Sequence, residues 1–182
     1  MTLSLLLACS ESASERVSDD PALVPVKVNV NPLPRYSVDS LDFAMMCGGV
    51  AHTPGKRLWA FWTAGGDSGK AFTVLMHSDD EGISWSDVDV VLDAHEPDRD
   101  CKTMGGCLWT DPEGRLWVFY GQSMSYFDGR SGTWYIRCDN PDSDRPVWSD
   151  PVRIWHGSAT NTPIVLRNGK WLLPVTLGDG SG

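Results

Sequence analysis

The chain has 182 residues, of which 41% are hydrophobic and 21% are charged, a balance that supports a folded core and excludes a disordered chain. Its formal net charge is −9 and its Lys and Arg residues are scattered along the sequence, so nucleic acid is not expected as a partner. No apolar run reaches the roughly 18 residues that a membrane-spanning helix needs. Nine Trp and 18 Gly exceed ordinary usage and call for an explanation.

Residues 1–20 are expected to be a targeting segment. The apolar run of residues 3–8 is followed by Cys9 and then by small and polar residues, and Leu6-Leu7-Ala8-Cys9 resembles the lipobox of bacterial lipoproteins. The resemblance implies export to the periplasm, the outer-membrane surface or the extracellular space, with membrane attachment only through lipidated Cys9. No Lys or Arg precedes the run, so an apolar terminus without a signal is the alternative. Residues 21–40 are expected to be a linker.

The remaining cysteines fit neither a metal knuckle nor a dense disulfide framework. They are Cys47, Cys101, Cys107 and Cys138, and we expect buried small side chains or at most one disulfide. A calcium site at Asp79, Asp80 and Glu81 is not favoured, because the loop lacks the alternating ligands of an EF-hand. No metal and no cofactor is predicted.

A repeat organises the rest of the chain. Residues 52–62 (HTPGKRLWAFW) match residues 110–120 (TDPEGRLWVFY), and residues 165–175 (VLRNGKWLLPV) are a weaker third copy. Each copy has two apolar segments around a turn, which is typical of a β-hairpin.

Further strands are expected after each hairpin. They fall at residues 71–77, 87–93, 133–138 and 151–155. The acids Asp87, Asp89 and Asp93 are expected to form the solvated face of an outer strand.

Four short strands in a unit of roughly 57 residues are typical of a propeller blade. We therefore predict an all-β fold, a β-propeller of four-stranded antiparallel blades, over residues 41–182. The units fall at about 45–93, 104–155 and 160–182. Six blades would need about 340 residues, so the chain is expected to be an N-terminal fragment with about two and a half blades of a six-bladed propeller.

The turn at residues 78–85 (SDDEGISW) matches the Asp box, S-x-D-x-G-x-[ST]-W, at all five fixed positions. These are Ser78, Asp80, Gly82, Ser84 and Trp85. Asp80 can accept hydrogen bonds from turn amides, Gly82 can adopt a left-handed conformation, and Trp85 can fill the space between sheets. The motif is a fold signal and not a catalytic one.

The second unit keeps a degenerate Asp box, in which Trp148-Ser149-Asp150 echoes Trp85-Ser86-Asp87. Together with the repeat, this turn resembles the sialidase (neuraminidase) superfamily, whose propellers carry BNR or Asp-box repeats.

Alternating strand directions place four segments at one end of the blades, namely residues 63–70, 94–104, 121–132 and 156–162. Polar residues on such loops are candidates for a shared pocket. The candidate substrate-binding residues are Lys102, Gln122, Asp128, Arg130 and Asn161.

The sialidase resemblance implies that Asp67 is an acid/base catalyst. In that family the catalytic aspartate lies in the second-to-third loop of the first blade, in a D-x-G context eleven residues before the Asp-box serine, and Asp67-Ser68-Gly69 followed by Ser78 fits. The alternative is that Asp67 only stabilises a Gly-rich turn. The R-I-P arginine that binds the sialic acid carboxylate is replaced by the Met46-Cys47-Gly48-Gly49 segment, so a neutral or differently charged sugar is favoured.

The predicted function is an exported glycoside hydrolase of sialidase-like fold that acts on a glycan terminus, with Asp67 as acid/base. The resemblance implies a Tyr/Glu nucleophile pair in later blades. Two alternatives stay open: a propeller that binds glycans without cleaving them, and a polysaccharide lyase with His95 or His156 as base. The expected partner is a glycan or oligosaccharide.

Overall fold

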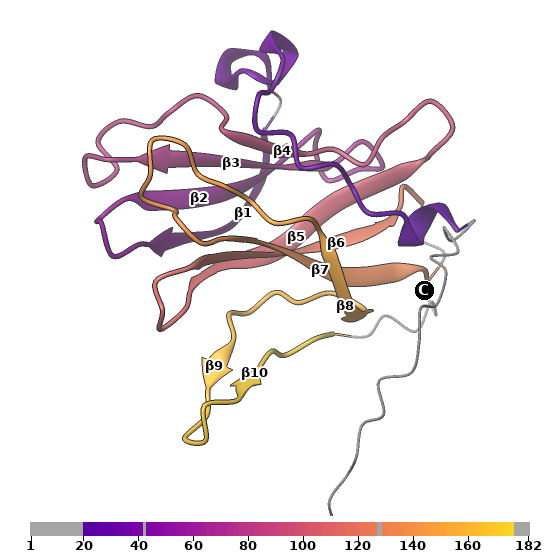
Figure 1. Cartoon of the computed structure of the whole chain (residues 1–182). Coiled ribbons are helices and arrows are strands. Elements are labelled where there is room, and N and C mark those ends of the chain that lie inside the picture. Colours follow the sequence, from indigo (N-terminus) through magenta and orange to yellow (C-terminus); the bar gives the residue numbers. More distant parts are fainter. Residues whose placement is uncertain (1–19, 42, 127–128, 177–182) are drawn as a thin grey trace, which may run out of the picture.

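The fold consists of two four-stranded antiparallel sheets that lie face to face, followed by a short hairpin (Figure 1). The computed structural model describes residues 20–41, 43–126 and 129–176, with the backbone alone at residues 43–47. The first sheet contains β1 (Phe43–His52), β2 (Leu58–Ala64), β3 (Phe72–Ser78) and β4 (Val90–Leu92), and the second contains β5 (Cys101–Thr110), β6 (Leu116–Met124), β7 (Ser131–Cys138) and β8 (Val152–His156). The hairpin is formed by β9 (Ile164–Val165) and β10 (Trp171–Leu172). The predicted all-β fold of four-stranded antiparallel blades is confirmed.

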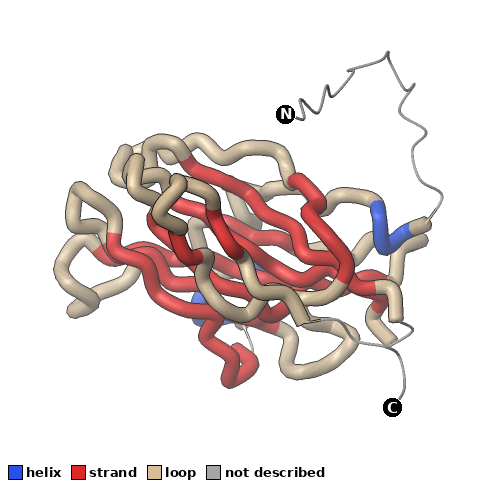
Figure 2. Tube along the Cα trace, turned by 90° about the horizontal axis from the view of Figure 1, so that it is seen from below, coloured by secondary structure: helices blue, strands red, loops and turns tan. Residues whose placement is uncertain are grey.

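Each sheet is a meander in chain order, so its connections alternate between two ends of the blade. We call the ends of β2, β4, β6 and β8 the upper end, and the opposite end, which carries the Asp box, the lower end. The Asp-box turn follows the arrowhead of β3 at the left of Figure 1. Figure 2 shows the strands running alongside one another with the loops gathered at their ends.

The three copies of the repeat fold into the same hairpin turn. The first turn residue donates its backbone N–H to the carbonyl four residues later, from Thr53 to Arg57 (2.9 Å), from Asp111 to Arg115 (3.0 Å) and from Leu166 to Lys170 (2.8 Å). In the second and third copies the left-handed position is a glycine, with φ of 81° at Gly114 and 76° at Gly169. In the first copy the glycine comes one residue early, and Lys56 takes the left-handed φ of 75°.

Replacing Lys56 by glycine is therefore expected to raise the free energy of unfolding by about 0.5–1 kcal/mol. A residue with a Cβ in the left-handed region costs about 1–2 kcal/mol, and glycine removes this cost. Glycine also loses more backbone entropy on folding, which offsets part of the gain. Chemical denaturation measures the difference. Gly169→Lys is the matched control, since a Cβ there meets nothing within 4 Å, and it should destabilise by a similar amount. A Lys56→Gly variant less stable than the parent would contradict the argument.

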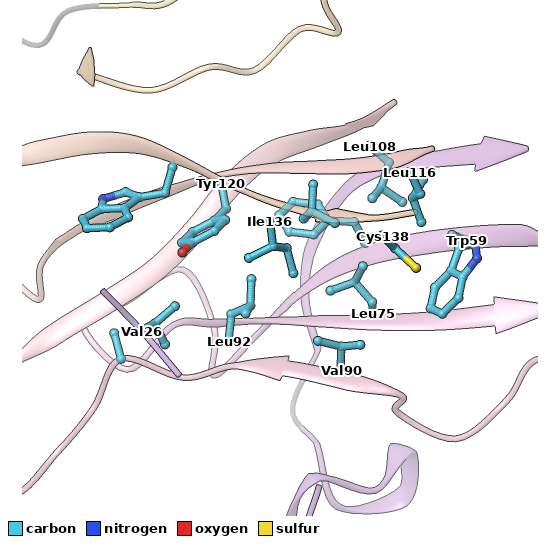
Figure 3. Close-up of a cluster of buried hydrophobic side chains, with 14 of the residues drawn as sticks. Val26, Trp59, Leu75, Val90, Leu92, Leu108, Leu116, Tyr120, Ile136 and Cys138 are labelled. Carbon is cyan, nitrogen blue, oxygen red and sulfur yellow. The ribbon is translucent and has the colours of Figure 1, made fainter. Parts of the chain in front are cut away.

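The core lies between the two sheets, and alternate residues of β2 point into it. Trp59 and Phe61 are fully buried and face the second sheet. Figure 3 shows Trp59, Leu75, Leu116 and Ile136 in this core. The equivalent residues of β6, Trp117 and Phe119, are buried as well.

On β6, Trp117 and Phe119 lie on the face that points away from the first sheet, where they pack with Trp171 of the β9–β10 hairpin. The rings of Trp117 and Trp171 meet edge to face, with centroids 5.2 Å apart. Some of the tryptophans thus pack between successive sheets.

The lower ends of the two blades are joined by a buried arginine. Arg57 is only 7% exposed, and its Nε and Nη2 donate to the two carboxylate oxygens of Asp79 at 2.7 and 2.9 Å. Its Nη1 donates to the carbonyl of Ser143 in the second blade at 2.8 Å. The Asp79 carboxylate raises the pKa of Arg57, and the guanidinium lowers the pKa of Asp79.

The Asp box forms the predicted turn between β3 and β4. Asp80 accepts hydrogen bonds from Ser84 Oγ at 2.6 Å, from the Ser84 backbone N–H at 2.8 Å and from Ser78 Oγ at 2.8 Å. These donors, the Ser84 hydroxyl foremost, lower the pKa of Asp80 from 3.8 to about 2. Gly82 adopts φ of 86°, as expected.

The degenerate second Asp box has the same backbone pattern. Ser86 and Ser149 each donate a backbone N–H at 2.8 Å, to the carbonyl oxygens of His77 and Arg137 respectively. Each serine hydroxyl accepts the N–H of the same partner, at 2.9 and 3.0 Å. Asn140 takes the place of Asp80 and accepts the N–H of Val147 at 2.8 Å.

One expectation for the Asp box needs correction, because Trp85 does not lie between the two described sheets. It is 37% exposed and lines an apolar recess on the outer face of the first blade with Val38, Trp62 and Met76. Trp148 of the second box does lie against the shared core, with its ring edge-on to Trp59 at 5.5 Å. The first sheet covers Trp148, whereas no described sheet covers Trp85.

Replacing Asp80 by asparagine should lower thermal stability in a pH-dependent way. Because the folded-state pKa of Asp80 is depressed, its carboxylate stabilises the fold above the ordinary value of 3.8, and this contribution is lost as the pH falls toward about 2. The difference in Tm between parent and variant should be constant above about pH 5 and should shrink between about pH 4 and 2. Thermal scans across this range measure it, and a difference that stays constant down to pH 2 would contradict the assignment.

Residues 21–40, expected to be a linker, pack against both sheet faces and are an integral part of the fold. Ala22 and Val26 enter the core between the sheets, and Asn29 exchanges backbone hydrogen bonds with Val91 of β4, at 3.0 and 2.9 Å. The segment contains three short 3-10 turns, η1 (Pro21–Leu23), η2 (Pro34–Tyr36) and η3 (Val38–Ser40). Tyr36 packs on the opposite face of the first sheet, so the segment wraps around the outer strand.

The expectation of a solvated acidic face is correct for Asp87, which is exposed, whereas Asp89 and Asp93 are half-buried. Asp87 accepts the N–H of Val38 at 2.8 Å, and Asp93 accepts the hydroxyl of Tyr36 at 2.8 Å. Asp89 instead accepts from Ser86 Oγ at 2.6 Å. The N-terminal segment therefore bonds to Asp87 and Asp93, whereas Asp89 is hydrogen-bonded within its own hairpin.

Three cysteines, Cys101, Cys107 and Cys138, are buried and free, as expected. Burial raises the pKa of Cys107 to about 12 and that of Cys138 to about 11. Cys9 and the predicted targeting segment lie outside the described residues. Among the described residues, no helix has the length and apolar character to cross a membrane.

Candidate functional site

Three upper loops meet at one backbone carbonyl, two residues after Asp67. The Gly69 carbonyl oxygen lies 2.8 Å from His95 Nε2, on the β4–β5 connection, and accepts a hydrogen bond from Ser125 Oγ, after β6, at 2.8 Å. A Cβ added to Gly69 would lie 3.1 Å from Ser125, so the loops are in close contact there. The strand ends thus bring together loops that are up to 56 residues apart in sequence.

Local chemistry shapes the loop that carries Asp67. Gly65 and Gly66 adopt left-handed φ angles of 80° and 77°, and Ser68 Oγ donates to the Gly65 carbonyl at 2.9 Å. A Cβ at Gly65 would lie 2.2 Å from the carbonyl oxygen of Lys70, so only glycine fits. Asp67 is exposed on this loop and has no hydrogen bond or ion pair with the described residues. Its carboxylate is therefore available to a ligand.

Behind the junction lies a chain of polar groups. His95 Nδ1 lies 2.7 Å from Asp93 Oδ1, and Tyr36 donates its hydroxyl to Asp93 Oδ2 at 2.8 Å. Burial and the Asp93 carboxylate raise the pKa of Tyr36, so its hydroxyl stays protonated and donates. None of these side chains is fully exposed.

The other predicted site residues have varied environments. Lys102 is half-buried in β5, opposite Ser123 of β6, and Asn161 is exposed after β8. Arg130 forms an ion pair with Asp20 at 2.9 Å. Asp128 lies outside the described residues.

Gln122 is fully buried and serves the N-terminal segment. Its Nε2 donates to the carbonyl oxygens of Ala22 at 3.0 Å and Val24 at 2.7 Å. A ligand could reach it only if that segment moved away. We therefore leave Gln122 out of the proposed site.

The two histidines considered as lyase bases are both hydrogen-bonded. His156 Nδ1 lies 3.0 Å from Arg153 Nη2, which can only donate, so that nitrogen accepts. His95 faces an acceptor at each ring nitrogen. Neither histidine is positioned in this arrangement as a base with a free lone pair at the Gly69 junction.

Strand β1 leaves no room for an arginine at Gly48, one of the positions where the sialidase resemblance implies that arginine. A Cβ built on Gly48 would lie 1.4 Å from the ring of Phe61, so no side chain fits without displacing a core aromatic residue. Gly49 follows with φ of 129° at a β-bulge. An arginine at position 48 would therefore require the Phe61 ring to move.

Sequence reasoning missed Tyr36, Asp93 and Ser125 as parts of the site. Tyr36 lies in the segment predicted to be a linker, and Asp93 lies on the strand predicted to have a solvated face. Ser125 is one of several small polar residues on its loop, and nothing in the sequence distinguishes it. Within the described ranges, no three His, Cys, Asp or Glu side chains gather as a metal-binding set.

Comparison with known proteins identifies the repeat. A family model described as a BNR repeat-like domain matches residues 56–181, more than half of the chain. A search of the curated proteins found no match. The matched region contains the Asp box, the whole second sheet, the Asp67 loop and His95.

Proposed function

This chain belongs to the BNR repeat-like domain family, and on that premise we propose that it is a glycoside hydrolase that acts on a glycan terminus. The observation that carries the proposal is the exposed Asp67 carboxyl group on a loop whose neighbouring carbonyl is fixed by His95 and Ser125. A carboxyl group so placed can protonate a leaving glycosidic oxygen and then accept a proton from water. The crowded Gly48 position favours a neutral or differently charged sugar over sialic acid.

A second function, glycan binding without cleavage, is supported by two observations. The general acids of glycosidases are commonly placed in apolar surroundings, whereas Asp67 is exposed. Tyr126, next to Ser125 on the adjoining loop, is 56% exposed and offers an aromatic ring on which a sugar can stack.

Product analysis separates these functions. The full-length protein should be incubated with a panel of aryl glycosides and natural oligosaccharides, and its products analysed by mass spectrometry. We expect hydrolysis, in which the masses of the two fragments add up to the mass of the substrate plus one water. Binding without any product would favour the second function, and an unsaturated fragment without added water would indicate a lyase.

We also propose that the protein is exported and attached to a membrane through a lipidated Cys9. Mass spectrometry of the protein from its native host tests this proposal. A mature N-terminus at Cys9 that carries acyl chains is the expected result, and an unprocessed cytoplasmic chain would contradict it.

A further inference from the structure

An unbroken chain of four hydrogen bonds runs from the N-terminal segment to the Asp67 loop. Arg35 Nη2 donates to the Tyr36 hydroxyl at 2.8 Å, and that hydroxyl donates to Asp93 Oδ2 at 2.8 Å. Asp93 Oδ1 lies 2.7 Å from His95 Nδ1, and His95 Nε2 lies 2.8 Å from the Gly69 carbonyl oxygen.

The chemistry of the end groups fixes the donors. A backbone carbonyl can only accept, so Nε2 of His95 carries a hydrogen. The carboxylate of Asp93 also accepts, and Nδ1 therefore donates to it. The ring of His95 is thus held between the Asp93 carboxylate and the Gly69 carbonyl.

Other charged side chains near His95 share a recess with Asp93. With Asp93 they line a recess of about 400 Å³, and they are Lys27, Glu96, Asp98 and Arg99. Lys27 and Glu96 form an exposed ion pair at 3.9 Å, and Arg99 Nε donates to the Pro21 carbonyl at 3.1 Å. Among these groups, Asp93 alone has a hydrogen bond to the His95 ring.

We infer that His95 is a positioning residue for Asp67, oriented in turn by Asp93 and Tyr36; this inference rests on the proposed hydrolase function. His95 and Ser125 fix the Gly69 carbonyl from two loops, which sets the path of the backbone two residues from the Asp67 carboxylate. Without His95, Ser125 alone among the described residues would hydrogen-bond to that carbonyl. Residues 34–36 thereby contribute to the site through Tyr36, which bonds to Asp93.

The test compares His95→Ala, His95→Gln and Tyr36→Phe in the full-length protein, with the best substrate of the panel. His95→Ala should lower kcat by about 10- to 100-fold with KM changed less than about twofold, because misplacing a catalytic group slows chemistry more than binding. His95→Gln should restore kcat to within about threefold of the parent, since its amide N–H can reach the Gly69 carbonyl. Tyr36→Phe keeps the ring and should cause a smaller loss than His95→Ala. His52→Ala, at the lower end of β1, is the control and should match the parent.

Loss of kcat in His95→Gln equal to that in His95→Ala, or a parallel rise in KM, would overturn the inference. Amide hydrogen exchange provides a second measurement that needs no activity. The N–H groups of Lys70 and Ala71, which bond to Ser68 at 3.1 and 3.2 Å, should exchange faster in His95→Ala and at the parental rate in His95→Gln. If the protein cleaves no glycan, the proposed function fails, and exchange alone then decides whether His95 positions the loop. Unchanged exchange in His95→Ala would overturn the inference.

Discussion

Replacing Asp67 by asparagine is expected to lower kcat by about 10²- to 10⁴-fold and to leave KM within about threefold of the parent. Asparagine has nearly the same shape as aspartate but cannot donate and recover a proton at the glycosidic oxygen. Because Asp67 has no hydrogen bond or ion pair with the described residues, the change should not alter Tm. Steady-state kinetics on the substrate found in the panel measure the effect.

The matched control is Asp144→Asn, an exposed aspartate on the lower loop of the second blade. It should leave kcat and KM unchanged. An Asp67→Asn variant with parental kcat would remove Asp67 from the mechanism and leave it as a residue of a Gly-rich turn.

Replacing Trp59 by alanine is expected to reduce the free energy of unfolding by about 3–5 kcal/mol. Trp59 is 0% exposed, and its indole N–H donates to the Pro141 carbonyl of the second blade at 3.1 Å. Its ring also packs edge-on against Trp148, with centroids 5.5 Å apart. Truncation would leave a cavity at the contact between the blades, and urea denaturation measures the loss.

Two variants show whether the loss comes from this contact. Trp59→Phe keeps most of the buried ring and removes the indole N–H, so it should lose only about 1–2 kcal/mol. Trp155→Ala, in β8, removes a tryptophan that is 60% exposed and should change stability by less than about 0.5 kcal/mol. Equal losses at Trp59 and Trp155 would contradict the proposed packing between blades.

Local patterns in the sequence predicted much of the fold. The hairpin turns depend on residues within five positions of one another, and the Asp box depends on Ser78, Asp80 and Ser84, which bond within one short turn. Such motifs can be read without knowing the rest of the chain. The repeat then predicted two four-stranded sheets from one pattern.

Long-range packing is what the sequence did not reveal. Gln122 bonds to the Ala22 carbonyl across 100 residues, and Tyr36 bonds to Asp93 across 57. No periodicity identifies such pairs, so residues 21–40 resembled a linker and Asp93 resembled a surface acid. For the site, the resemblance pointed to the Asp67 loop, whereas its support by His95 and Ser125 depends on how three loops converge.

Amide hydrogen exchange of the full-length protein, with and without a saturating glycan from the panel, tests most directly the proposal that the upper end binds the glycan. We expect protection at the upper end, in residues 65–70, 125–126 and 129–130, and no change in the Asp-box turn at residues 79–84. Protection at the lower end, or on the outer face of the first blade around Trp62 and Trp85, would contradict it.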